Sequence, residues 1–304
     1  MRKYCYIILS VIWVTAPATA FAQAISPCNI VSGEITDEVS DHPGRGWCLI
    51  TPEAMQIKLH FIGLCATEPD WDDYEAKCSQ LFKSDQGQLV TVEKNKPLPL
   101  IDEISLVEGT YSHAAIFIDR SIRHSSIVTF DSPRRGKSGD PGLPSPTEGK
   151  ICWSLDVGSG NDPAEDDYAN FGAECGNTAS NVGYNTSENV ILYDMVTNAR
   201  GDISTGSTAS TTWKVILLNE NKERDSDLTD NEVDNAKYFI GIQKFNTPVN
   251  ITPSLESVDL SFRLTNTFGV LMGHDDHDND NTTPPLNTVR RFVLGGFEFK
   301  VDAK

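Results

Sequence analysis

The chain lacks the short motifs that identify common classes of enzyme. It contains no Gly-x-Ser-x-Gly elbow, no His-Glu-x-x-His pair and no glycine-rich phosphate loop. After residue 22 it also lacks an apolar run close to the ~20 residues that a membrane-spanning helix needs. The sequence therefore gives no support to a serine esterase, a zinc protease or a nucleotide-binding enzyme, and it predicts a protein that is not inserted in a membrane.

Positive charge is also scarce. The 304 residues include 25 Lys and Arg against 43 Asp and Glu, which gives a formal net charge of −18. A negative field of this size repels phosphate backbones and anionic lipid surfaces, and it attracts cations. We therefore expect no nucleic-acid partner, and divalent cations are better candidate ligands.

The amino terminus has the pattern of a secretory signal. Arg2 and Lys3 precede an apolar run over residues 4–14, and Ala20-Phe21-Ala22 supplies small residues for cleavage before Gln23. The apolar run is shorter than a membrane span. Residues 1–22 are thus predicted to be removed, and the mature protein is predicted to be secreted, extracellular or at the cell surface, with the periplasm as the alternative.

Cysteines are few and even in number after the signal. The mature chain contains six: Cys28, Cys48, Cys65, Cys78, Cys152 and Cys175. An even set in an exported chain indicates disulfides more than metal ligation, although six cysteines allow 15 connectivities. We favour the sequential pairs 28–48, 65–78 and 152–175, because each pair brackets a polar, turn-rich stretch whose ends meet easily.

The apolar pattern indicates strands. From Met55, alternate residues up to Phe61 form one face, and Gln56, Lys58 and His60 form the other. Similar short segments follow at 88–93, 110–119, 121–130, 150–155, 189–195, 212–219, 236–242, 257–264 and 289–301. These segments, separated by Gly, Pro, Asn and Asp, predict an all-β fold of antiparallel sheets packed as one large or two smaller sandwiches.

One short helix is expected at residues 70–81. Asp70 is a good helix cap, and Trp71, Tyr74, Cys78 and Leu81 follow it at helical spacing. A 65–78 disulfide would clamp this helix against the preceding strand.

The domain division is drawn in a polar stretch at 131–149 that is rich in proline and glycine. It separates a β domain at 23–138 from a β region with long polar loops at 139–304, and the alternative is one continuous domain. A second polar stretch, 156–188, is crossed by the proposed 152–175 bridge, which indicates a structured excursion.

The sharpest local feature is an acidic segment at 273–281. Its Asp276, Asp278 and Asp280 place carboxylates at alternate positions, as calcium prefers. The EF-hand glycine and glutamate are missing, so a solvated acidic loop is the alternative. His274 and His277 supply only half of a tetrahedral zinc site.

Catalytic and carbohydrate-binding residues are harder to assign. His60, His113 and His124 lie inside strand-like segments, where histidines commonly have packing roles. The many carboxylates leave room for a polysaccharide-active hydrolase, whose two acids are distant in sequence. Among the mature chain's tryptophans, Trp71 is the best candidate to stack on a sugar, whereas Trp47, Trp153 and Trp213 suit packing.

The final segment suggests a route to assembly. Phe297, Phe299 and Val301 alternate in a carboxy-terminal strand that either pairs within its own domain, the default, or adds to the edge of a neighbouring copy.

Together these features predict a secreted, non-enzymatic structural or adhesive protein, foremost a subunit of an extracellular fibre, sheath or appendage. Its partners would be copies of itself or other surface proteins. The alternatives are a calcium-assisted carbohydrate-binding module and a polysaccharide-active hydrolase, with calcium as the candidate cofactor.

Overall fold

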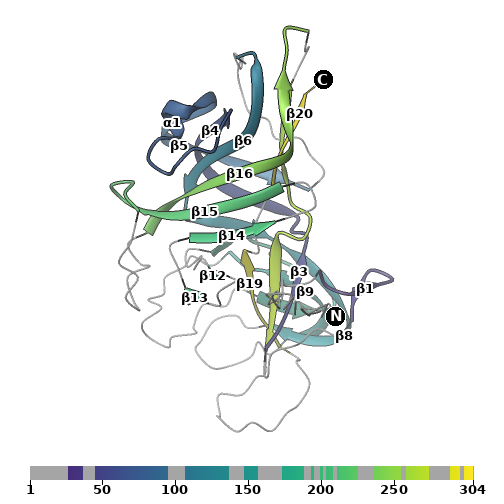
Figure 1. The fold of residues 1–304 in the computed structure, drawn as a ribbon. Coiled ribbons are helices and arrows are strands. Elements are labelled where there is room, and N and C mark those ends of the chain that lie inside the picture. The colour runs from purple at the N-terminus through teal and green to yellow at the C-terminus, as the bar shows by residue number, and fades with distance from the viewer. Residues whose placement is uncertain are drawn as a thin grey trace, which may run out of the picture.

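The computed structural model describes residues 27–36, 45–94, 107–136, 147–156, 173–187, 193–194, 199–200, 203–207, 211–224, 236–254, 258–273, 288–294 and 298–303. These residues form two large β-sheets stacked on each other, with one turn of helix outside the upper sheet as drawn (Figure 1). The all-β, sandwich-like fold expected from the short apolar segments is confirmed.

Sheet one has eight strands in the order β1-β2-β8-β19-β18-β3, with β9 paired to β8 and β10 to β9. Their bounds are β1 (Ile30–Val31), β2 (Glu34–Ile35), β3 (Arg45–Ile50), β8 (Ile127–Gly136), β9 (Glu148–Ser154), β10 (Ala173–Gly176), β18 (Phe268–Gly273) and β19 (Thr288–Leu294). The pairings are antiparallel apart from two short parallel ones, β2 with β8 and β19 with β8.

Sheet two has eight strands in the order β11-β7-β4-β6-β16-β15-β14, with β5 paired to β4. Their bounds are β4 (Ala54–Cys65), β5 (Cys78–Glu93), β6 (Gly109–Asp119), β7 (Ile122–Ser125), β11 (Asn185–Ser187), β14 (Ile203–Ser207), β15 (Thr211–Asn219) and β16 (Ala236–Ile251). Two smaller pairs join β12 (Tyr193–Asp194) to β13 (Ala199–Arg200) and β17 (Val258–Arg263) to β20 (Glu298–Ala303).

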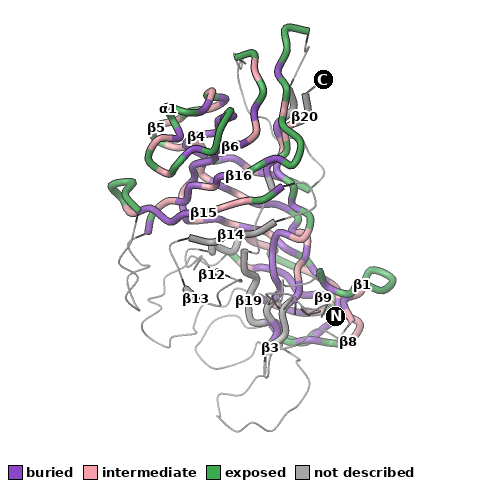
Figure 2. Tube along the Cα trace, viewed as in Figure 1, coloured by how far each residue is buried: buried purple, intermediate pink, exposed green. Residues whose placement is uncertain are grey.

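The main core lies between the two large sheets. It joins Leu59 of β4, Ile118 of β6 and Phe239 of β16 to Phe130 of β8 and Phe268 of β18. All five side chains are almost completely buried. Figure 2 shows buried stretches along the strands of sheet two. Burial of apolar surface at about 25 cal/mol per Å² makes this layer the principal source of stability.

Sheet two is also buried on its other, outer face. Phe61, Phe117, Ile216 and Ile240 form a second apolar cluster there, to which Tyr74 belongs. Strands buried on both faces read as nearly continuous apolar runs, which explains the sequence of β6 at residues 114–118.

The alternation predicted for β4 is wrong at its end. Met55, Ile57 and Leu59 face the main core as expected, but Phe61 belongs to the outer cluster. The reason is a bulge: Leu59 is opposite Ile118 of β6, but Phe61 is opposite Phe117, so His60 has no partner in that register. An extra residue in one strand reverses the faces of all residues after it.

The predicted helix at 70–81 is much shorter in the structure. Helix α1 covers only Tyr74–Lys77, and Cys78 already starts β5. Asp73, and not Asp70, occupies the cap position, and no side chain caps the helix. The helical spacing was misleading because Tyr74 packs in the outer cluster, whereas Leu81 packs in the main core.

The segment at 121–130 was expected to be one strand, but it divides at Ser126. β7 belongs to sheet two and β8 to sheet one, so the chain crosses between the sheets there. The Ser126 amide donates to Oγ of Ser154, and the Ser154 amide donates to the Ser126 carbonyl. These bonds satisfy backbone groups that the crossing removes from both ladders.

Both sheets contain strands from both sides of residue 139, where a domain boundary was drawn. In sheet two β6 pairs with β16, and in sheet one β8 pairs with β9 and β19. The boundary itself lies outside the described residues.

Candidate functional site

The polar feature that stands out in sheet two is centred on the bulge of β4. There His60 has no partner in the register of either neighbouring strand, because β5 passes from Gln88, opposite Leu59, to Lys83, opposite Phe61. Residues 84–87 of β5 therefore bulge outward beside His60. Bulges of this kind redirect side chains and are common next to functional sites.

Three charged or titratable side chains meet at this bulge. The imidazole Nε2 of His60 lies 2.6 Å from Oδ1 of Asp119, and Nζ of Lys58 lies 3.5 Å from Oδ2 of the same carboxylate. The His60 side chain is 8% exposed, whereas those of Asp119 and Lys58 are 21% and 43% exposed. The cluster thus runs from the buried sheet to the surface.

Aromatic rings hold the imidazole in place. The ring centroid of His60 lies 5.3 Å from that of Phe117 and 5.4 Å from that of Tyr238, and Phe117 and Tyr238 are 5.0 Å apart. Nζ of Lys222 lies 5.3 Å from the Phe117 centroid, within reach of a cation–π contact. Phe117, Tyr238 and Asp119 therefore hold the His60 ring, and the hydrogen bond to Asp119 sets its orientation.

A histidine bonded to a carboxylate is one part of a general-base arrangement, which also needs a nucleophile or a positioned water. In the described part of the chain, Asp119 is the side chain to which His60 is hydrogen-bonded. The geometry supports a role for this cluster in shaping the bulge, and thereby the course of β5.

Glycine is required where β5 returns from the bulge. Gly87 has φ +71°, and a Cβ there would lie 2.7 Å from Cε1 and 2.8 Å from Nε2 of His60. After Gly87 the strand runs regularly along β4 from Gln88 to Glu93. Because β6 and β7 occupy the opposite edge of β4, this part of β5 forms an edge of sheet two, and no other described strand pairs with it.

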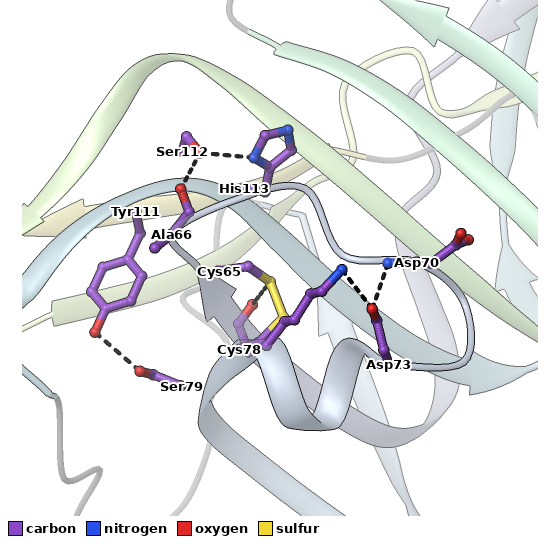
Figure 3. The surroundings of a disulfide bond; sticks show 11 residues. Cys65, Ala66, Asp70, Asp73, Cys78, Ser79, Tyr111, Ser112 and His113 are labelled. Carbon is purple, nitrogen blue, oxygen red and sulfur yellow. Dashed lines mark hydrogen bonds and ion pairs between the residues drawn. A yellow bond between two sulfur atoms is a disulfide. The ribbon is translucent and has the colours of Figure 1, made fainter.

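A disulfide closes the other end of β5. Cys65, the last residue of β4, is bonded to Cys78, the first residue of β5, and the excursion between them contains α1 (Figure 3). Trp71 and Tyr74 of this excursion pack on the outer face of sheet two. Burial there raises the pKa of the Tyr74 hydroxyl far above its usual value.

A second histidine lies at the base of the same excursion. Nδ1 of His113 is 2.8 Å from Oγ of Ser112, and that hydroxyl donates to the carbonyl of Ala66 (Figure 3). Burial lowers the pKa of His113, opposed by the charge of Glu68 and assisted by Lys244. His113 is therefore buried and tied to the excursion through Ser112, in agreement with the packing role expected for it.

His124, the third histidine of a strand-like segment, is completely buried. Its ring lies 4.4 Å from that of Phe268, and its Nδ1 is 3.2 Å from Oγ of Ser126. It supports the point where the chain crosses between the sheets.

The six cysteines of the described residues form the sequential pairs. Cys28 is bonded to Cys48, Cys65 to Cys78 and Cys152 to Cys175. The last two pairs join residues that are directly opposite each other on neighbouring strands.

The structure describes only some of the remaining predicted site residues. Asp276, Asp278, Asp280 and Phe297 lie outside the described residues. Within the described ranges, no group of three or more His, Cys, Asp or Glu side chains is arranged to hold a metal ion.

Phe299 and Val301 lie in β20, which pairs with β17 of the same chain. Phe299 is buried in the main core, with its ring 5.4 Å from that of Phe262. The amide side chain of Gln243 in β16 extends this pairing: its Nε2 donates to the Phe299 carbonyl at 2.5 Å, and its Oε1 accepts from the Phe299 amide at 2.9 Å.

Two groups were missed by sequence reasoning. His60 was assigned to a regular strand face, and Gln243 was given no role. Gly87, directly before the alternating run at 88–93, was the available signal for an irregularity in β5. The pairing of Gln243 with β20 leaves no local signal, because the residues are 56 apart in sequence.

None of the helices in the described ranges has the length and apolarity to cross a membrane. Comparison of the chain with protein-family models, with curated proteins and with solved structures finds no match.

Proposed function

We propose that this chain is an exported structural or adhesive protein, and foremost a subunit of an extracellular fibre, sheath or appendage. The observation that carries the proposal is the distribution of the three disulfides over both sheets. Such bonds form and persist in oxidising compartments. They support a protein that is exposed to an oxidising environment and is built for rigidity.

Each disulfide closes a short loop of the chain. The bonded cysteines are separated by 20, 13 and 23 residues, and all six side chains are buried. Closing loops of this length stabilises a fold by about 3 kcal/mol per bond in the chain-entropy model. A sandwich held in this way keeps its shape without a cellular folding environment, as a surface subunit must.

The surfaces of sheet two favour contact through its edges. Its inner face packs against sheet one, and part of its outer face carries the outer cluster, on which Trp71 and Tyr74 pack. An edge strand still presents backbone N–H and C=O groups that another strand can pair with. Copies of the chain, or other surface proteins, are therefore the proposed partners.

The proposal is tested by expressing the full chain in an exporting host, beside a variant with Ile8→Arg and Leu9→Arg in the apolar amino-terminal run. We expect the unaltered chain outside the cytoplasm, without residues 1–22, with no free thiol, and forming assemblies visible by electron microscopy. The variant should stay in the cytoplasm. An unaltered chain that stays in the cytoplasm with reduced cysteines, or that remains monomeric at every concentration, would contradict the proposal.

A further inference from the structure

The three disulfides follow one another along the chain. The bonded cysteines are separated by 20, 13 and 23 residues, and no bonded pair encloses a cysteine of another pair. A chain that is exported unfolded, amino end first, therefore presents both cysteines of one pair before the first cysteine of the next. The order of emergence by itself is able to select the native pairs.

Loop length does not select the first pair. Cys65 follows Cys48 by fewer residues than the 20 that separate Cys28 from Cys48. The entropy of loop closure changes slowly with length, so both loops close with similar probability in an unfolded chain. A bond between Cys48 and Cys65 is not compatible with the fold, because Cys48 lies in β3 of sheet one and Cys65 ends β4 of sheet two.

Local backbone pairing supports the second and third disulfides but gives little help to the first. Cys65 is directly opposite Cys78, and Cys152 is directly opposite Cys175, on neighbouring antiparallel strands. Around Cys28 the contact is one bridge, in which the Cys28 amide donates to the Leu49 carbonyl at 2.9 Å.

Strand β3, which contains Cys48, has its ladder with β18, and β18 is among the last strands of the chain. When β3 emerges during export, its partner strand has not yet been made available. A two-residue contact without a larger sheet is too weak to hold Cys48 beside Cys28. Another cause must therefore keep Cys48 from reacting with Cys65.

We infer that the Cys28–Cys48 bond closes during export, before Cys65 emerges, and that a thiol oxidase of the exporting compartment is the partner that makes it. One cysteine thiolate attacks the disulfide of the oxidase and forms a mixed disulfide, from which the second cysteine displaces the enzyme. Two thiols of this chain are oxidised to one disulfide, two protons are released, and the disulfide of the oxidase is reduced to two thiols.

No wrong bond has to be broken in this sequence, so oxidation is the required reaction and disulfide isomerisation is not. The inference rests on the proposed function, because it needs a chain that is exported. It goes further in naming the class of enzyme that acts on the chain and the order of its reactions.

The test compares two routes to the oxidised chain. In an exporting host, the full chain is pulse-labelled, its free thiols are alkylated at successive times, and its disulfides are mapped without reduction. In solution, the purified mature chain is reduced, unfolded and reoxidised in a glutathione buffer, and it is mapped in the same way. We expect an early Cys48–Cys65 bond in solution, beside Cys28–Cys48, and the loss of that bond during export.

The matched control is the Cys65→Ser, Cys78→Ser double variant, which removes the competing thiol and should form the Cys28–Cys48 bond early by both routes. Hosts that lack either enzyme supply a second measurement. The yield of native disulfides should fall without the thiol oxidase and stay unchanged without a disulfide isomerase.

Three results overturn the inference but leave the proposed function standing. They are an early Cys48–Cys65 bond in the exported chain, its absence from the reoxidised chain, which would show that the chain itself selects the pair, and a yield that depends on the isomerase. A chain that stays in the cytoplasm with reduced cysteines overturns both.

Discussion

Glycine at position 87 shows how one residue sets the geometry of the β4–β5 bulge. Its positive φ costs an L-residue about 1–2 kcal/mol, and a Cβ would press on the His60 imidazole, which Phe117, Tyr238 and Asp119 hold in place. We therefore expect Gly87→Ala to lower the free energy of unfolding by more than the conformational cost alone, as measured by urea denaturation with the disulfides intact.

Gly33 supplies the control for this prediction. It has φ +86° in the β1–β2 turn, but a Cβ there would meet nothing within 4 Å. Gly33→Ala should cost only the conformational part. Equal losses for the two variants would show that the His60 cluster yields freely and does not shape the bulge.

At the scale of elements, the side chain of Gln243 hydrogen-bonds β20 to β16 of sheet two. Replacing Gln243 with Leu leaves the buried N–H and C=O of Phe299 without the partners that the amide supplies. Each unsatisfied buried group costs about 1–3 kcal/mol, so the loss of partners for these two groups should lower the free energy of unfolding by about 2–6 kcal/mol. The Phe299 amide should also lose protection in hydrogen exchange.

A graded variant separates this effect from a change in packing. Gln243→Glu keeps an acceptor for the Phe299 amide but loses the donor to its carbonyl, so it should retain part of the Phe299 protection. If Gln243→Leu keeps full protection at Phe299, β20 is held by its pairing with β17 and not by Gln243.

At the scale of the whole molecule, the negative charge makes calcium the ligand to test. If Asp276, Asp278 and Asp280 bind it, calcium at 100 times its dissociation constant should stabilise the fold by about 2.7 kcal/mol. The melting temperature of the unaltered chain should then rise with calcium and fall with a chelator, as measured by calorimetry.

The triple Asp→Asn variant at these positions is the control and should lose the calcium response. A response of the same size in the variant would assign it to the diffuse acidic surface. Equal melting curves with calcium and with chelator would leave only a solvated acidic loop.

Much of the architecture was predictable because its causes are local. The three disulfides follow from cysteines that bracket short polar stretches, and most strands follow from alternating apolar residues between turn formers. The predicted strand face is wrong at Phe61, because one extra residue in β4 reverses which side chains face the main core. The pattern of apolar residues in β4 does not mark this extra residue. The helix is confirmed but shorter than predicted, because Cys78 and Leu81, which continue the helical spacing, belong to β5.

The sequence by itself determined the class of fold, the disulfide pairs and the acidic character of this protein, since each depends on composition or on residues close along the chain. Only the tertiary structure decided where the chain crosses between the sheets at Ser126, which residues meet around His60, and that β5 pairs with β4 alone among the described strands. These features depend on pairing between distant segments. The backbone hydrogen bonds between two paired strands are the same for any residue. The side-chain pattern of one strand therefore does not specify which other strand will pair with it.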